Sequence, residues 1–365
     1  MRRSLIAAVA TAALAAPLTL AATGTATAAP QAPRAAKAPV ADFNKDGYAD
    51  LAISAPEGTV GGKEGAGYVA VMYGSASGPD KAHPRLIHRG TAGVPGDVAE
   101  GQSFGTETTI GDFDGDGYTD LVVSDYGFTT KSVALWGSKD GLTDAASEFP
   151  HARGRLTSGD FNGDGHRDLV TSEYQGGPES DDSGMTISYG PFARGGEPAS
   201  KDTVSAGAFR EIHELVAGDL NGDGVDDLVS SHGFEDKAYA SKFWQGTKDG
   251  LSHTSTPLKS SIGGTVADVD GDGFGDFVTR DNGGSQEDND SEAGTVRVDY
   301  GSAAGPAATR TVKITQDSPG VPGVGEGRRR DLAGRLQRRR HVRLRHQRGR
   351  HQRRRLRGRR RRRPR

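Results

Sequence analysis

The segment "DFNGDGHRDLVTS", Asp160–Ser172, recurs along the chain in close variants. The other copies are "DFNKDGYADLAIS" from Asp42, "DFDGDGYTDLVVS" from Asp112, "DLNGDGVDDLVSS" from Asp219 and "DVDGDGFGDFVTR" from Asp268. All five follow D-x-[DN]-x-D-G-x-x-D and continue into an apolar run rich in β-branched residues. Successive copies start 70, 48, 59 and 49 residues apart. This spacing is typical of a four-stranded propeller blade with loop insertions.

The acidic part of each copy predicts a calcium loop. Calcium takes about six to eight oxygen ligands, and side chains at loop positions 1, 3 and 5 converge on one point. Glycine at position 6 permits the sharp turn. Position 7 offers a backbone carbonyl and position 9 a further carboxylate. The Ca²⁺ ligands expected are Asp42, Asn44, Asp46, Tyr48, Asp50; Asp112, Asp114, Asp116, Tyr118, Asp120; Asp160, Asn162, Asp164, His166, Asp168; Asp219, Asn221, Asp223, Val225, Asp227; and Asp268, Asp270, Asp272, Phe274, Asp276.

The loops differ from an EF-hand in their surroundings. An EF-hand has Glu at position 12 and a helix on either side. In the first copy position 12 is Ile53, within the strand-like run "LAIS". We therefore expect each loop to connect two strands. Metal-free Asp/Gly hairpin turns are the alternative, and it carries more weight for a single copy than for all five.

A second element follows each loop and completes an all-β repeat. It is an alternating strand that ends in an aromatic residue, glycine and a turn. The copies are "YVAVMYG" from Tyr68, "SVALWG" from Ser132, "MTISYG" from Met185, "SKFWQG" from Ser241 and "VRVDYG" from Val296. Trp136 and Trp244 end equivalent strands, which favours blade packing over ligand stacking. The 54 glycines and the low apolar content also fit many short strands and tight turns.

The repeats resemble the FG-GAP (VCBS-type) repeats of the integrin α-subunit propeller and of secreted bacterial proteins. The resemblance covers about residues 41–327. "QSFG", ending at Gly105, and Ala55-Pro56 correspond to the two parts of the family name, and both marks are eroded in later copies. The resemblance implies a seven-bladed β-propeller with calcium in its hairpin loops. Because only five blades are legible, we expect an incomplete ring.

The N-terminal region predicts export. Two arginines, an Ala/Leu-rich stretch and "ATA" at Ala26–Ala28 are typical of a signal peptide, here residues 1–28. Residues 29–40 are a Pro/Ala-rich linker. We therefore expect a secreted, extracellular protein with no membrane span after signal cleavage. With no cysteine, the secreted chain must be stabilised by something other than disulfides.

The C-terminal tail, residues 328–365, has 21 arginines and one acid, Asp331, which leaves 25 basic and 47 acidic residues in the rest of the chain. "DFNGDG" in GC-rich codons, read from the third base, gives Leu-Gln-Arg-Arg-Arg, the sequence of Leu336–Arg340. A hidden "DINGDGYADVAVGAP" likewise gives His351–Pro364. We interpret this disordered, Arg-rich tail as an out-of-frame translation, so no nucleic-acid partner is expected. A genuine basic arm is the rival interpretation.

The sequence favours a binding or adhesion module with an extracellular protein or glycan ligand. A lectin-like carbohydrate binder and a polysaccharide-active enzyme built on a propeller are the alternatives. "GQSFG" at Gly101–Gly105 matches a hydrolase nucleophile motif, but such a motif needs a strand before it and a helix after it. No catalytic constellation is found, so we expect no enzymatic activity.

Overall fold

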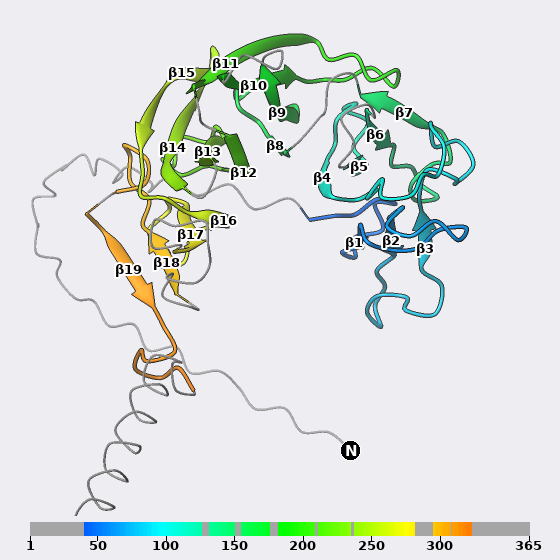
Figure 1. Ribbon diagram of the computed structural model, residues 1–365, viewed down its shortest axis with the longest axis horizontal. Helices are drawn as coiled ribbons and strands as arrows, with labels where there is room; N and C mark the ends of the chain where they lie inside the picture. The colour runs from blue at the N-terminus through cyan, green and yellow to red at the C-terminus, as the bar shows by residue number, and fades with distance from the viewer. Residues whose placement is uncertain are drawn as a thin grey trace, which may run out of the picture. The chain divides into compact units, whose positions relative to one another are not determined.

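The computed structural model describes residues 40–125, 131–149, 155–175, 182–208, 211–234, 237–281, 295–307 and 309–322. Within these ranges the regular secondary structure is all β-strand (Figure 1). None of the described segments forms a helix long and apolar enough to cross a membrane. The expected signal peptide, the linker apart from Val40, and the arginine-rich tail lie outside the described residues.

The strands form five antiparallel sheets, each a simple meander in chain order, which we call blades 1–5. Blade 1 has β1 (Leu51–Ala55), β2 (Tyr68–Met72) and β3 (Arg85–Ile87). Blade 2 has β4 (Glu107–Gly111), β5 (Asp120–Ser124), β6 (Ser132–Leu135) and β7 (Ala146–Phe149). Blade 3 has β8 (Leu156–Gly159), β9 (Asp168–Gln175), β10 (Asp182–Tyr189) and β11 (Ser200–Ala208). Blade 4 has β12 (Glu211–Gly218), β13 (Asp227–Phe234), β14 (Lys237–Thr247) and β15 (Gly250–Pro257). Blade 5 has β16 (Ile262–Ala267), β17 (Asp276–Arg280), β18 (Val296–Asp299) and β19 (Thr311–Ile314).

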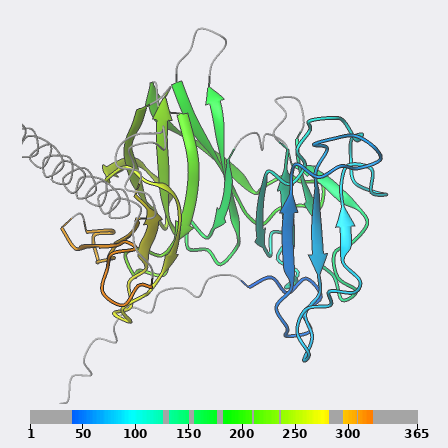
Figure 2. The same cartoon turned by 60° about the horizontal axis from the view of Figure 1, so that its bottom comes forward.

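Consecutive blades pack through their first strands, as in a propeller. Strand β4 packs on β8, β8 on β12, and β12 on β16. Figure 2 shows the strands of blade 1, blue to cyan, lying side by side within their sheet. The expected five blades are confirmed, and four of them have the expected four strands. In the described part of the chain, blade 1 has three.

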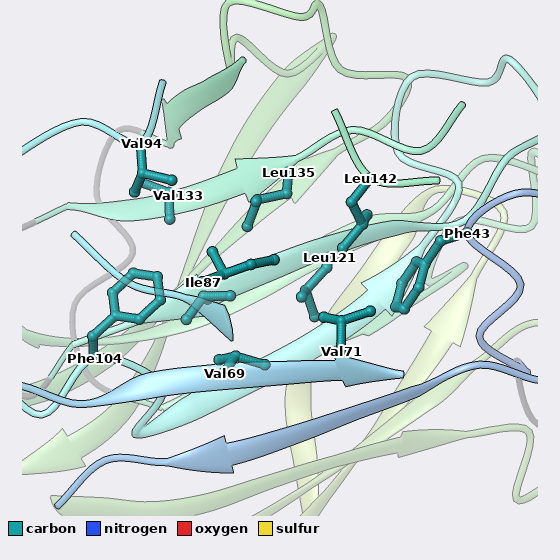
Figure 3. Packing of buried hydrophobic residues seen from close by; sticks show 11 residues of the cluster. Phe43, Val69, Val71, Ile87, Val94, Phe104, Leu121, Val133, Leu135 and Leu142 are labelled. Carbon is teal, nitrogen blue, oxygen red and sulfur yellow. The ribbon is translucent and has the colours of Figure 1, made fainter. Parts of the chain in front are cut away.

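The hydrophobic core consists of layers between neighbouring blades. Successive residues of one strand pack into the layers on opposite sides of the blade, since their side chains point to opposite faces of the sheet. Leu121 and Val123 of β5 are buried against blade 1, whereas Val122 packs against blade 3. Figure 3 shows the layer between blades 1 and 2, where Phe43, Val69 and other buried apolar side chains of the two blades meet.

The "FG" segment crosses from blade 2 back to blade 1. The Ser103 and Phe104 amides donate to the Gly65 and Ala66 carbonyls at 2.8 and 2.9 Å. Gly67 has φ +79°, and a Cβ there would lie 2.4 Å from the Phe104 backbone, so glycine is required. Ser103 is followed by strand β4, not by the helix that a nucleophile elbow needs. This segment is therefore a structural crossing between blades.

Candidate metal centres

Each acidic loop folds around the carboxylate at position 1. In loop 3 (160–168), Asp160 accepts the Asp164 amide at 3.1 Å and the Gly165 amide at 3.0 Å. The Asp164 carboxylate accepts the His166 amide at 2.8 Å. Loops 1 (42–50), 2 (112–120), 4 (219–227) and 5 (268–276) repeat the bond from the position 6 amide to the position 1 carboxylate. Glycine at position 6 has positive φ in all five loops, so the turn needs it.

The aspartate at position 9 clamps the loop to the neighbouring strand. In loop 3, Asp168 accepts the Phe161 amide at 2.8 Å and the Gly190 amide at 2.9 Å, one on each oxygen. Gly190 is the glycine that follows the aromatic residue in the second sequence element. The same pair of bonds is made by Asp50, Asp120, Asp227 and Asp276. This role explains why both sequence elements recur together.

Burial raises the pKa values of these clamping carboxylates. The five lie between 0% and 4% exposed. Burial raises the pKa of Asp120 and of Asp168 from 3.8 to about 7, although the two backbone donors pull it down. Burial likewise raises the pKa of Asp227 to about 8. The other loop carboxylates also raise these pKa values, so a nearby cation would favour the ionised form.

The loops fall into two kinds according to the residue at position 3. Loops 1, 3 and 4 have Asn there, and its amide donates to the position 5 carboxylate at 2.9–3.0 Å. Loops 2 and 5 have Asp there, and an arginine outside the motif pairs with positions 3 and 5. Arg194 contacts Asp114 at 2.6 Å and Asp116 at 2.5 Å. Arg310 pairs with Asp270 and, at 2.9 Å, with Asp272.

Carboxylate groups converge in the two Asp-type loops. Among the described residues, Asp112, Asp114 and Asp116 bring one oxygen each within 4.8 Å of one another. Asp268, Asp270 and Asp276 do the same in loop 5. The donors in all five loops are carboxylate, amide and carbonyl oxygens, without sulfur, and this set suits calcium or magnesium better than softer metals. The residues present therefore fit the expected Ca²⁺.

Neighbouring loops are also bonded to one another, which the sequence pattern did not reveal. The Thr119 amide donates to the Asp42 carbonyl at 3.3 Å, and the Asp226 amide to the Asp160 carbonyl at 2.8 Å. Both donors stand at position 8, which varies freely in the motif. Asp226 also pairs with Arg167, from position 8 of the preceding loop, at 2.8 Å. The Gly275 amide, at position 8 of loop 5, likewise donates to the Asp219 carbonyl at 3.0 Å. Loops 1 and 2 are thus bonded to each other, and loops 3, 4 and 5 form a connected series.

The two tryptophans are packing residues, as expected. Trp136 is 2% exposed and Trp244 is 1% exposed, in the layers between blades 2 and 3 and between blades 3 and 4. The Trp136 indole donates to the Ser147 hydroxyl at 3.0 Å and the Trp244 indole to Ser230 at 2.8 Å. Both rings therefore have their polar group satisfied inside the fold.

The fold and its loops together define a β-propeller whose blades carry Asp-rich hairpin loops. The family model of the FG-GAP repeat matches residues 36–72, and that of the FG-GAP-like repeat matches residues 112–171. Integrin alpha-IIb of Mus musculus is 33% identical over 96 residues, which are 26% of this chain and 8% of that protein. These matches and the five blades agree with an integrin-like propeller of FG-GAP repeats. The chain spans only a small part of the length of this relative.

One solved structure is similar at low identity. The chain is 16% identical to a chain of the Photorhabdus luminescens Tc holotoxin pore, with a TM-score of 0.37. The match covers 78% of this chain and 12% of that one. At this TM-score the similarity adds nothing to the assignment above.

Proposed function

We propose that this protein is a secreted, calcium-binding FG-GAP propeller that acts as a binding or adhesion module. The supporting observation is the same cradle of oxygen donors in five loops, each clamped by a buried aspartate that accepts two backbone amides. The similarity to an integrin α-subunit supports an extracellular protein ligand. A glycan ligand is the second possibility within the same class of function.

The chain's own residues would hold the ion through positions 1, 3 and 5, with the position 7 carbonyl and the position 9 carboxylate completing the set. Bound calcium supplies positive charge that offsets the repulsion among these carboxylates. The backbone amides that already contact positions 1, 5 and 9 fix where the carboxylates point. Because position 9 also holds the glycine at the end of the adjacent strand, an ordered loop keeps the whole blade in register.

Calcium binding by the full chain tests the first half of this proposal. We expect equilibrium dialysis to give close to five ions per chain, one for each loop. Extracellular calcium modules bind with dissociation constants of roughly 10⁻⁴–10⁻³ M. An Asp164→Ala chain should lose one ion, and Asp97→Ala, which lies outside every loop, should lose none. A chain that binds no calcium would contradict the proposal.

Ligand binding tests the second half. The calcium-loaded chain is presented to arrays of extracellular matrix proteins and of soluble glycans, and the same polysaccharides are followed for depolymerisation. We expect retention on a protein or glycan without shortening of any polysaccharide. Depolymerisation by the purified chain would favour the enzyme alternative.

A further inference from the structure

The outward faces of the first and last blades are unusually apolar. Every large hydrophobic residue in the described chain that is at least 40% exposed belongs to blade 1, blade 5 or the segments leading into strands β1 and β17. In blade 1, Leu51 is 43%, Ile53 49% and Leu86 50% exposed. Ile53 pairs with Ala70, and Ala70 pairs with Leu86, so Ile53 and Leu86 share one face of the sheet. We call this the blade 1 face.

The opposite end of the blade series carries a matching surface. In blade 5, Val269 is 52%, Val312 42% and Ile314 40% exposed. Val298 pairs with Val278 on one side and with Val312 on the other, and Val296 pairs with Ile314. Because Val296 and Val298 are two residues apart on β18, all five side chains lie on one face of the sheet. We call this the blade 5 face. Contiguous apolar patches on a protein surface mark sites of association.

The repeat shows what normally covers each face. The residue after the position 9 aspartate, Leu51 in blade 1, is 0–2% exposed in every other blade, where it packs on the preceding blade. The residue at position 2, Val269 in loop 5, is 0% exposed in every other loop, where it packs on the following blade. The blade 1 face and the blade 5 face are therefore the two halves of the interface that joins blades inside the chain.

We propose that these halves join between copies, with the blade 5 face of one chain packed on the blade 1 face of a second. Neighbouring blades within the described chain already pack on each other through this kind of contact. Such a contact is heterologous, so it can extend from copy to copy instead of stopping at a dimer. Each face is an apolar surface rich in β-branched residues, and the other face offers it a surface of the same kind to pack against.

Complementary blocking variants test this proposal. Ile53→Lys places a charge on the blade 1 face, and Val269→Lys places one on the blade 5 face, both at half-exposed positions that tolerate a lysine in the single chain. Burying an unpaired charge in the contact should raise its dissociation constant about a hundredfold or more. Ala199→Lys, at an exposed residue of blade 3, is the matched control.

Sedimentation velocity gives the readout. We expect the wild-type chain and Ala199→Lys to grow in mass with concentration, and each blocking variant alone to stay monomeric. An equimolar mixture of the two blocking variants should form dimers and nothing larger, because one intact half remains on each chain. A wild-type chain that stays monomeric at all concentrations, or a mixture that fails to dimerise, would overturn the proposal. Dimers of one blocking variant alone would show self-pairing faces and also contradict it.

A separate observation concerns the arginines of the Asp-type loops and rests on the proposed calcium binding. At ligand positions 1, 3, 5 and 9 the carboxylate groups number four in loops 2 and 5 but three in loops 1, 3 and 4, and one arginine accompanies each additional group. Arg194 lies over the Trp136 ring at 5.9 Å and Arg310 over the Tyr300 ring at 4.6 Å. Both rings end the strand that position 9 clamps, so the two arginines occupy equivalent places.

The arginines occupy the carboxylate oxygens that the backbone leaves open. In loop 2 the Oδ1 atoms of Asp114 and Asp116 accept backbone amides, and their Oδ2 atoms accept Arg194. We infer that Arg194 and Arg310 are internal cations that calcium must displace, which makes loops 2 and 5 a weaker class of site. Arg194 comes from blade 3, so filling loop 2 also releases a contact between blades 2 and 3.

Calcium titration of full-length variants tests this inference. We expect Arg194→Gln and Arg310→Gln each to tighten one of the weaker sites about five- to tenfold, as for removal of a competing ion pair. Arg85→Gln, which breaks the pair with Asp144 far from any loop, controls for net charge and should change no site. In a Trp244→Phe background, calcium should alter Trp136 fluorescence, and the change should be lost in Arg194→Gln.

The titrations distinguish failure of the proposed calcium binding from failure of the arginine inference. Absence of calcium binding by every chain would contradict the proposed function itself. Normal binding with unchanged affinities in both arginine variants would overturn the arginine inference alone.

Discussion

Adding excess EDTA to the calcium-loaded protein is expected to lower its melting temperature by roughly 10–25 °C. A site with a dissociation constant of about 10⁻⁴ M gains about 1.4 kcal/mol at about 1 mM calcium. Five such sites give about 7 kcal/mol, which is comparable to the whole stability of a typical domain. Weaker binding in loops 2 and 5 moves the result toward the lower end. Calorimetric scans with calcium, and with calcium plus EDTA, provide the measurement.

Two controls make this result specific. Magnesium at the same concentration should restore less of the lost stability, because it demands a stricter octahedral shell than calcium. EDTA added together with a molar excess of calcium should leave the melting temperature unchanged. Equal melting temperatures with and without chelator would show that the loops hold the blades together without metal.

The loops and their strands could be predicted from the sequence because the determinants are local. Glycine at position 6 and a β-branched run after position 9 specify a turn and a strand without reference to the rest of the chain. Ile53 lies in strand β1, as the departure from the EF-hand indicated. The packing role of Trp136 and Trp244 followed from their equivalent places at the ends of repeated strands.

Contacts between blades could not be predicted, because they join residues far apart in the chain. Arg194 lies 80 residues from Asp114, and nothing in its own segment marks it. The clamping role of position 9 was also missed. The pattern predicts Asp168 as a metal ligand, and the structure adds that each of its oxygens accepts a backbone amide. The available signal was a glycine that recurs after the aromatic residue, directly in four copies and one residue later at Gly246.

The expected four strands per blade are confirmed for blades 2–5, and the described part of blade 1 has three. Loop 1 has the same Asn-type pattern as loops 3 and 4, so its sequence gives no sign of this difference.

The ion pair between Arg89 and Asp125 joins blades 1 and 2 inside the protein. Its side chains are 2% and 0% exposed, and two hydrogen bonds of 3.0 and 3.1 Å connect them. The guanidinium also donates to the Pro95 and Lys131 carbonyls, at 2.7 and 2.5 Å, and lies over the Phe104 ring. All of its partners are therefore fixed by the fold, and removing one of them leaves a buried charge without its counter-ion.

Asp125→Ala is expected to lower the free energy of unfolding by about 3–5 kcal/mol, because it strands the Arg89 charge in a low-dielectric interior. Arg89→Met should lower the free energy of unfolding by a similar amount, because it leaves the Asp125 carboxylate buried without its counter-ion. The double variant should lose less than the sum of the two, since neither charge is then left behind. Urea unfolding in saturating calcium measures all three, with Asp140→Ala at the exposed Lys139 pair as the neutral comparison. Additive losses would show that each residue acts through packing alone, independently of the ion pair.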